Sequence, residues 1–557
     1  MSVVTTPHIS SNGKVAPSER PAIAEKSAEL KKWKSWQRLL FRIAFIFFIS
    51  ISIPNSPEWY KIVFNIDWTN LHYRDLYDIA RFGSGINFFG NSIFGNALLG
   101  YANWITTLLL SIASGLVWTL IAKRRKTERN EYNILYYWLR VIVRYRAGIG
   151  IIGFGFTKLL PVQMPYPSLG LLNTNLGDFT AQKIYWLSIG IVPWYQVFAG
   201  VVEVTAGTLL FFRRTTTLGA ILLFGALGDI VYVNFSYDGG VHVYSSYFVL
   251  LAAFLLIDDL PRIYRLLVQE KYTVAVHIYP VFKSKWQQFA RAGLKAATVF
   301  VFLILLFKLQ LVNFLYDPYK QPSVAGLTTL RGNYNVTEFR INNQLVPYSP
   351  VDSVRWQEVT FEKWTTLTYK VNRPTLIDLS NGGGDPQKDI NRTFELSGTG
   401  GGRRVFHYYA DTVRNVLYLE DKFKAVPDRR NRAAGVGGDG GTDKNLGVVK
   451  NGSLNGREII ARKSKADNWI PAESAAVIGT ELDKINKRAA STRRVREFAE
   501  PQKNEKRNRM VFKYETRDGS HIILTGVNEN SDSLYIILDR ADRKYALAES
   551  GLQAGKY

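Results

Sequence analysis

Long apolar runs occupy the first 316 residues of this 557-residue chain, and they constrain its fold more than any other feature. A helix that crosses a bilayer needs about 20 predominantly apolar residues. About seven runs approach that length, at 38–54, 98–122, 138–160, 186–212, 216–236, 243–258 and 296–316. The sequence therefore predicts an α-helical polytopic membrane domain.

Basic residues beside these runs predict which side of the membrane each loop faces. Lys and Arg are concentrated at 31–38, 123–129, 213–214 and 262–295. The positive-inside rule places such segments in the cytoplasm. An odd number of spans then puts the N-terminus in the cytoplasm and the C-terminal half outside it, at the cell (inner) membrane. Segment 262–295 suits an interfacial helix on anionic lipid and a solvated connector equally well.

The overall composition excludes several kinds of chemistry. Much of the net charge of +24 lies at the ends of apolar runs, so we expect the bilayer, and no nucleic acid, as the partner. The chain has no cysteine, which excludes disulfides, thiolate catalysis and Cys-bound metal clusters. Its six histidines have no metal-like spacing, so no metal site and no intrinsic cofactor are predicted. If the protein takes part in electron transfer, another molecule must carry the electrons.

The C-terminal half reads as a mainly β soluble domain, because short alternating segments replace the long apolar runs. Val354–Val371 predicts one or two strands, and Arg403–Leu419 predicts a hairpin. Asp518-Gly519 supplies turn chemistry for a second hairpin, which Ser533–Leu538 extends by a third strand. Ala472–Ala490 has helical periodicity.

These patterns divide the chain into five predicted parts. They are a disordered tail (1–30), two N-terminal spans with an outer loop (31–134), a four-helix membrane bundle (135–268), a basic connector with the last span (269–318), and a mainly β extracytoplasmic domain (319–557) with a Gly-rich loop near 432–457.

Ionisable residues inside the apolar runs form the candidate site, because an unpaired charge in hydrocarbon is costly. Arg144 and Arg146 lie in the third run, Glu203 in the fourth and Asp229 in the fifth. A helical rise of about 1.5 Å per residue places the arginines roughly 10 Å and Glu203 roughly 13 Å from the same surface. We therefore expect an Arg–Glu pair, whose role is either to fix helix packing or to form a functional polar site. Asp229 lies about 20 Å in and has no partner at its depth.

Three further residues complete the candidate set. Lys158, near the outer end of the third run, can extend its ammonium group toward the interface. Asn234 and His242 lie near the outer loop after the fifth run and are secondary candidates. A lone histidine in such a place is more often a loop residue than a ligand. A stripe of glycines from Gly148 to Gly155 in the third run predicts close helix packing.

Two of these segments resemble the DoxX-like family of four-helix membrane proteins. The run Arg144-x3-Gly148-x6-Gly155-x2-Lys158-Leu159 is similar to the opening helix of that family. Gly200-Val-Val-Glu203, followed by Gly207, resembles its Glu-containing second helix. The resemblance covers roughly residues 135–268, which makes this chain an extended member with extra spans and a soluble domain. The multi-span domain of vitamin-K-type carboxylases is a looser match.

The resemblance implies a redox-associated role. Some DoxX-like proteins resemble small subunits of membrane quinone oxidoreductases, so the first hypothesis is a quinone-linked membrane subunit or anchor with a redox partner. Arg144, Lys158 and Glu203 would then form its polar site. The second hypothesis is a non-enzymatic cell-envelope scaffold whose β domain binds a partner protein, because that domain far exceeds what a quinone anchor needs. Neither hypothesis establishes an enzyme.

Overall fold

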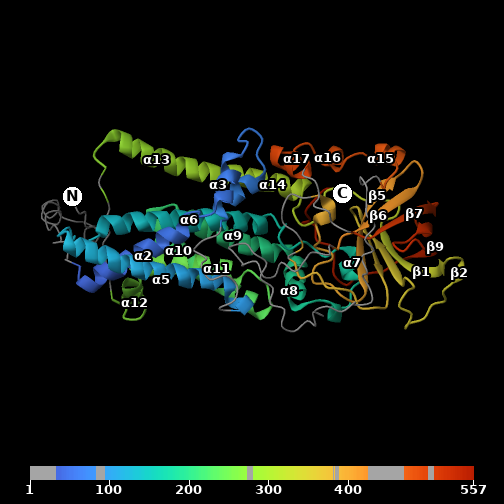
Figure 1. The fold of residues 1–557 in the computed structure, drawn as a ribbon, viewed down its shortest axis with the longest axis horizontal. Coiled ribbons are helices and arrows are strands. Elements are labelled where there is room, and N and C mark those ends of the chain that lie inside the picture. Colours follow the sequence, from blue (N-terminus) through green and yellow to red (C-terminus); the bar gives the residue numbers. More distant parts are fainter. Residues whose placement is uncertain are drawn as a thin grey trace, which may run out of the picture.

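The computed structural model describes residues 33–82, 95–271, 280, 282–380, 382, 388–423, 469–499 and 507–557. Helices form one end of an elongated molecule and a β-barrel forms the other (Figure 1). The predicted tail (1–30) and the Gly-rich loop near 432–457 lie outside the described residues.

The N-terminal half is helical throughout, as its apolar runs predict. Its α-helices are α2 (Ser35–Ser52), α3 (Pro57–Phe64), α4 (Tyr73–Ala80), α5 (Gly95–Arg124), α6 (Asn133–Leu159), α7 (Leu169–Leu172), α8 (Ala181–Gly190), α9 (Pro193–Leu210), α10 (Thr216–Ser236), α11 (His242–Leu256), α12 (Leu260–Leu267), α13 (Lys285–Val299) and α14 (Leu306–Tyr316). A π-helical turn, Phe300–Leu305, joins α13 to α14 in one long rod.

Several of these helices are long and apolar enough to cross a membrane. Four qualify alone: α2, Tyr101–Arg124 within α5, Arg213–Ser236, which contains α10, and the rod Lys285–Tyr316. Two bent pairs, α8 with α9 at 90° and α11 with α12 at 75°, raise the number to six if each pair is one span. The predicted number of about seven is therefore not confirmed. Helix α6 has 27 residues but is not among these candidate spans.

Arg42 is a charged side chain of the helical half that neighbouring helices satisfy. Arg42, in the middle of α2, is fully buried. Its guanidinium donates to the Tyr132 hydroxyl at 2.8 and 3.1 Å and to the Thr119 hydroxyl at 2.6 Å. The guanidinium also lies over the rings of Trp118 and Tyr132. An arginine inside an apolar run therefore ties α2 to α5 and to the start of α6.

Glycines bring α6 and α9 into direct contact. A Cβ on Gly155 would lie 2.7 Å from the Val204 side chain and 2.9 Å from the Val204 backbone nitrogen. A Cβ on Gly200 would meet the backbone of Leu159. The glycine stripe is thus a packing device, as small residues in helix interfaces commonly are.

The C-terminal half is an eight-stranded antiparallel barrel, which refines the predicted mainly β domain. The strands are β1 (Gly332–Ile341), β2 (Gln344–Leu345), β3 (Glu358–Phe361), β4 (Thr366–Lys370), β5 (Arg403–Asp411), β6 (Val416–Asp421), β7 (Arg509–Thr516), β8 (His521–Val527) and β9 (Ser533–Ala541). Each strand from β3 to β9 pairs with the next, β1 pairs with both β3 and β9, and β2 only extends β1. Closure removes the free sheet edges.

Aromatic and aliphatic side chains fill the barrel interior. Trp356 stacks on Tyr369 with ring centroids 3.8 Å apart, and Tyr369 stacks on Phe406 at 5.6 Å. These residues belong to one buried cluster that extends round the barrel. An eight-stranded barrel is just wide enough for such side chains. The interior is therefore a packed core.

Three short helices connect the barrel to the helical half. They are α15 (Ala472–Ile478), α16 (Glu481–Lys484) and α17 (Thr492–Ala499). The single helical segment predicted at Ala472–Ala490 is thus divided, since Gly479 takes a positive φ of 65° and ends α15. Arg493 pairs with Asp75 at 3.4 Å and with Asp78 at 2.7 Å, both on α4.

Candidate functional site

A pocket of about 130 Å³ lies where the helical half meets the barrel. Its walls come from the Pro-rich loop after α6, the start of α9, the β3–β4 turn and the C-terminal tail. The lining residues that the argument uses are Pro161, Met164, Pro193, Gln321, Glu362, Trp364 and Ala554. A cavity of roughly 150 Å³ can hold a benzene molecule, so this pocket matches a single six-membered ring.

The helical wall of the pocket is held in place by hydrogen bonds between a side-chain amide and the backbone. Gln196 of α9 accepts from the Met164 backbone N–H at 3.0 Å and donates to the Met164 carbonyl at 3.2 Å. Pro161 follows α6 after one residue, and Pro193 is the first residue of α9. Proline fixes φ and stops or starts a helix, so these positions define the ends of α6 and α9.

Glu362 is the buried carboxyl group in the pocket wall. Its oxygens accept from the backbone N–H groups of Leu169 at 3.1 Å and Gly170 at 2.7 Å. A Cβ on Gly170 would lie 3.1 Å from Oε1, so glycine permits this close approach. Burial raises the pKa of Glu362 to about 7. The negative charge of Glu395 also raises this pKa, and the hydrogen bond from Gly170 lowers it. A carboxyl group with this pKa can take up or release a proton near neutral pH.

Trp364 provides an aromatic wall whose orientation is fixed. Its indole N–H donates to Glu395, which is also an acceptor for Thr366 at 3.2 Å and pairs with Lys422 at 3.2 Å. The ring of the C-terminal Tyr557 lies 5.3 Å from the Trp364 ring. Because Glu395 is held from three sides, the indole is preorganised.

The last residues of the chain close the pocket. Tyr557 donates to the Pro322 carbonyl at 2.5 Å, and the Gly555 N–H donates to the Phe314 carbonyl at 2.8 Å. Lys363 pairs with Glu549 at 2.5 Å. The tail is thus tied to the end of α14 and to the β3–β4 turn.

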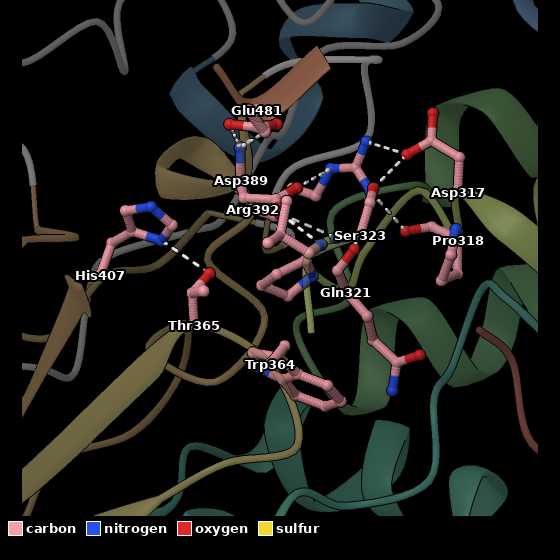
Figure 2. Close-up of polar contacts among 12 residues, drawn as sticks. Asp317, Pro318, Gln321, Ser323, Trp364, Thr365, Asp389, Arg392, His407 and Glu481 are labelled. Carbon is pink, nitrogen blue, oxygen red and sulfur yellow. Dashed lines mark hydrogen bonds and ion pairs between the residues drawn. The ribbon is translucent and has the colours of Figure 1, made fainter. Parts of the chain in front are cut away.

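A buried ion network lies beside the pocket (Figure 2). Arg392 donates to Asp317 at 2.5 Å, to the Pro318 and Gln321 carbonyls at 3.0 and 2.8 Å, and to Ser323 at 2.8 Å. Its carboxylate partner Asp317 caps the end of α14. Burial would raise the pKa of Asp317, but Arg392 and Arg494 outweigh that effect and hold the pKa below its usual range.

The network continues into the helical connection. Arg494 of α17 pairs with Asp317 at 3.3 Å and with Glu481 of α16 at 3.1 Å. Glu481 accepts from the Asp389 N–H with both oxygens at 3.1 Å. Four segments therefore share one set of buried charges, and this set fixes the barrel on the end of the last apolar helix.

The structure gives Glu203 a partner other than the arginine that its depth predicted. Lys158 of α6 forms the ion pair with Glu203 of α9, and the side chains are only 10% and 1% exposed. Lys158 therefore does not extend to the interface. The second carboxylate oxygen of Glu203 is buried without a hydrogen-bond partner in the described part of the chain.

The two predicted arginines of α6 point elsewhere. Arg144 donates to the Thr216 hydroxyl at 3.3 Å. Arg146 donates to the Ala80 carbonyl at 2.7 Å and lies over the Phe82 ring at 4.0 Å. The two residues lie in the same apolar run but occupy different faces of the helix, because neighbours two apart do not share a face. The expected Arg–Glu pair is therefore wrong.

Asp229, Asn234 and His242 do not join the Lys158–Glu203 pair in a common site. Asp229 is exposed on α10. Asn234 donates back to the Ile230 carbonyl at 2.7 Å. The buried His242 ring packs against Phe235, with centroids 4.5 Å apart. No three His, Cys, Asp or Glu side chains come together as a metal site among the residues described.

The pocket residues were missed by sequence reasoning. Glu362 follows the apolar strand segment Val359–Phe361, and a single carboxylate after such a strand is a common surface pattern. The available signal was the Pro-rich loop at 161–167, which must pack somewhere outside the bilayer. Only the folded chain shows that it packs on Glu362 and Trp364.

Comparisons with known proteins add little to this picture. No family model and no solved structure matches the chain. A curated relative, the uncharacterized protein YwoB of Bacillus subtilis (strain 168), is 33% identical over 76 residues. The match covers 14% of this chain and 49% of YwoB, so the chain spans about half the length of that relative.

Proposed function

We propose that this protein is a multi-pass membrane protein that takes the ring-shaped head of a membrane-soluble small molecule, a quinone, into the pocket at the barrel junction. In this role it is a quinone-linked subunit or anchor of a redox system, of the kind that the DoxX-like resemblance implies. The observation that carries the proposal is the pocket itself, with its ring-sized volume, its aromatic wall and a carboxyl group of near-neutral pKa.

The membrane placement is part of the same proposal. Helix α6 packs along α9, so it shares the depth of its apolar neighbours and becomes the seventh span. The basic segments 31–38 and 123–129 then lie in the cytoplasm. The barrel and the pocket lie on the outer side, at the ends of α6 and α9. A lipid-soluble molecule would reach the pocket at this level, where hydrocarbon meets the soluble domain.

The residues present suit a quinone head. A quinone supplies two-electron redox chemistry that is coupled to protons. Trp364 and the prolines offer flat apolar surface to a ring. Glu362 holds a proton at its carboxyl oxygens near pH 7, beside the same space. Electrons come from a partner protein in this proposal, because the chain has no cysteine for thiol or Cys-bound cluster chemistry.

The test is mass spectrometry of organic extracts from the full-length protein, purified with its native lipids. The proposal predicts about one quinone per chain, as expected for a single binding site. Ala554→Trp fills the pocket and should reduce the retained quinone at least tenfold. Ala475→Trp, on the exposed surface of α15, is the matched control and should retain it. Bulk lipid alone in the unmodified protein would contradict the proposal.

A second candidate function, the envelope scaffold, is favoured by one specific feature. The segment around β2 exposes apolar side chains at the end of the barrel away from the helices (Figure 1). They are Leu345, Tyr348, Val351 and Val354, at 59%, 68%, 81% and 49% exposed. Such a patch commonly marks a protein-binding surface.

The scaffold function is tested by cross-linking the full chain in intact cells. Val351→Asp should abolish one defined cross-linked product, whereas Val413→Asp, at another exposed valine, should not. Identical products from both variants would remove this candidate.

A further inference from the structure

Asp229 places a carboxylate on the outward face of α10. The helix packs against α9 and α11, and Asp229 is exposed and lies near Tyr185 of α8. The apolar side chain of Tyr232, 74% exposed, lies one turn further along the same face. Gly225 and Gly228 leave this face open, because a Cβ added to either would meet nothing within 4 Å. In the proposed membrane placement, this face meets hydrocarbon.

Lys308 places an ammonium group on the outward face of the last span. Helix α14 packs against α4 and α6, whereas α10 packs against α9 and α11. Lys308 is exposed, and so are the flanking side chains Ile304 (59%) and Leu311 (36%). Within the part of the chain that the structure describes, neither Asp229 nor Lys308 forms an ion pair.

The two charges lie at similar depth. Asp229 precedes the end of α10 at Ser236 by roughly 10 Å, and Lys308 precedes the end of α14 at Tyr316 by roughly 12 Å. Both helices run toward the barrel end in the same direction (Figure 1). A flexible lysine side chain covers the remaining difference. An ionised group against hydrocarbon is costly, so each charge gains most from an opposite charge at its own depth.

We propose that the Asp229 face of α10 in one copy of this chain binds the Lys308 face of α14 in a second copy. Gly225 and Gly228 let the partner helix approach closely, and the Asp229–Lys308 pair fixes the register. The two faces differ, so the contact is heterologous, of the kind that builds rings or open arrays of copies. The inference rests on the membrane placement proposed above and is independent of the quinone pocket.

The test uses the absence of cysteine. Tyr232→Cys and Leu311→Cys, each three residues beyond the paired charge, are placed in two differently tagged copies that are expressed together. A short thiol-specific cross-linker is then applied to intact membranes. The proposal predicts a product that contains both tags. Leu109→Cys, on the exposed face of α5, replaces Leu311→Cys in the control and should give at least tenfold less product.

Charge reversal gives a second readout. Asp229→Lys in both copies should lower the cross-linked product at least tenfold, and Lys308→Asp added to the same chains should restore it, since the pair is then reversed. Extraction at alkaline pH separates the possible failures. A chain released from the membrane would overturn the membrane placement and this contact together. A chain that stays in the membrane but gives no product above the Leu109→Cys control would overturn the contact alone.

Discussion

Arg392 of the barrel domain donates to Asp317 at the end of the last apolar helix, with 2.5 Å between Nη2 and Oδ1. The two side chains are 1% and 2% exposed, although 75 positions separate them in the sequence. Each group would be costly to bury alone. Together they fix the barrel on the end of α14, and the pocket lies beside this connection.

Removing one charge from this connection should destabilise the whole protein. Asp317→Asn removes the buried carboxylate that Arg392 and Arg494 share and leaves them only Asp389 and Glu481 as acidic partners. We therefore expect a loss of about 3–5 kcal/mol in the free energy of unfolding. The measurement is denaturation in detergent, followed by Trp fluorescence. Asp518→Asn, at an exposed turn, is the matched control and should change stability little. Equal effects of the two variants would refute the structural role of Asp317.

The same pair predicts a loss of stability in acid. The pKa of Asp317 in the folded protein lies below the ordinary value of 3.8, because Arg392 and Arg494 outweigh its burial. The carboxylate therefore stabilises the fold at pH values above the unfolded pKa, and the contribution disappears as the pH falls below about 4. The slope of stability against pH in this range should be smaller in Asp317→Asn.

Glu362 should give the opposite pH dependence. Its pKa is about 7 in the folded protein, against 4.5 for the ordinary group, chiefly because of burial. The protonated carboxyl group contributes fully to the free energy of unfolding below pH 4.5, and this contribution is lost as the pH rises through 7. The difference corresponds to about 3 kcal/mol. Glu362→Gln should remove this dependence between pH 5 and 8, as measured by the midpoint of thermal unfolding; an unchanged dependence would contradict it.

The Lys158–Glu203 pair should act as a structural unit of the bundle. Lys158→Met leaves Glu203 as an uncompensated buried charge and should cost about 3–5 kcal/mol. The double variant Lys158→Met with Glu203→Leu replaces both charges by apolar groups and should recover most of the loss. A double-mutant cycle measures the coupling. Additive effects would mean that the pair contributes nothing to stability.

Close packing of α6 on α9 can be tested at the glycines. A Cβ on Gly200 would meet the Leu159 backbone, so Gly200→Ala should cost about 1–3 kcal/mol. Gly293 in α13 has no atom within 4 Å of an added Cβ. Gly293→Ala should therefore stabilise the chain by about 0.5–1 kcal/mol through helix propensity. Thermal unfolding of both variants checks the contrast, and a neutral Gly200→Ala would contradict the packing.

The helical half could be predicted from the sequence because apolar runs of bilayer length have few alternative structures. Thr216–Ser236, for example, forms α10 over the predicted range 216–236. The hairpin at Asp518-Gly519 was also predictable, since this turn chemistry joins β7 to β8. Both signals are local, and local patterns survive without knowledge of the fold.

The partners of charged residues could not be predicted in this way. The depth estimate favoured Arg144 because it took Trp138 and Phe212 as level with each other. In the structure Tyr145 stacks on Phe211, so the two helices are offset and Glu203 meets Lys158. Barrel closure between β1 and β9 joins segments about 200 residues apart, and no local pattern encodes that pairing. The pocket depends on the same long-range contacts, because Pro161, Glu362 and Ala554 come from three distant segments.

The most direct test of the account is to find where a quinone binds. The full-length protein in lipid nanodiscs is labelled with a photoreactive quinone analogue, and the labelled peptides are identified by mass spectrometry. The account predicts labelling within 161–172 or 545–557, lost in Ala554→Trp and kept in Ala475→Trp. Labelling confined to α6 and α9 around Lys158 and Glu203 would contradict a quinone site at the junction. Labelling that persists in the presence of excess unmodified quinone would contradict it as well.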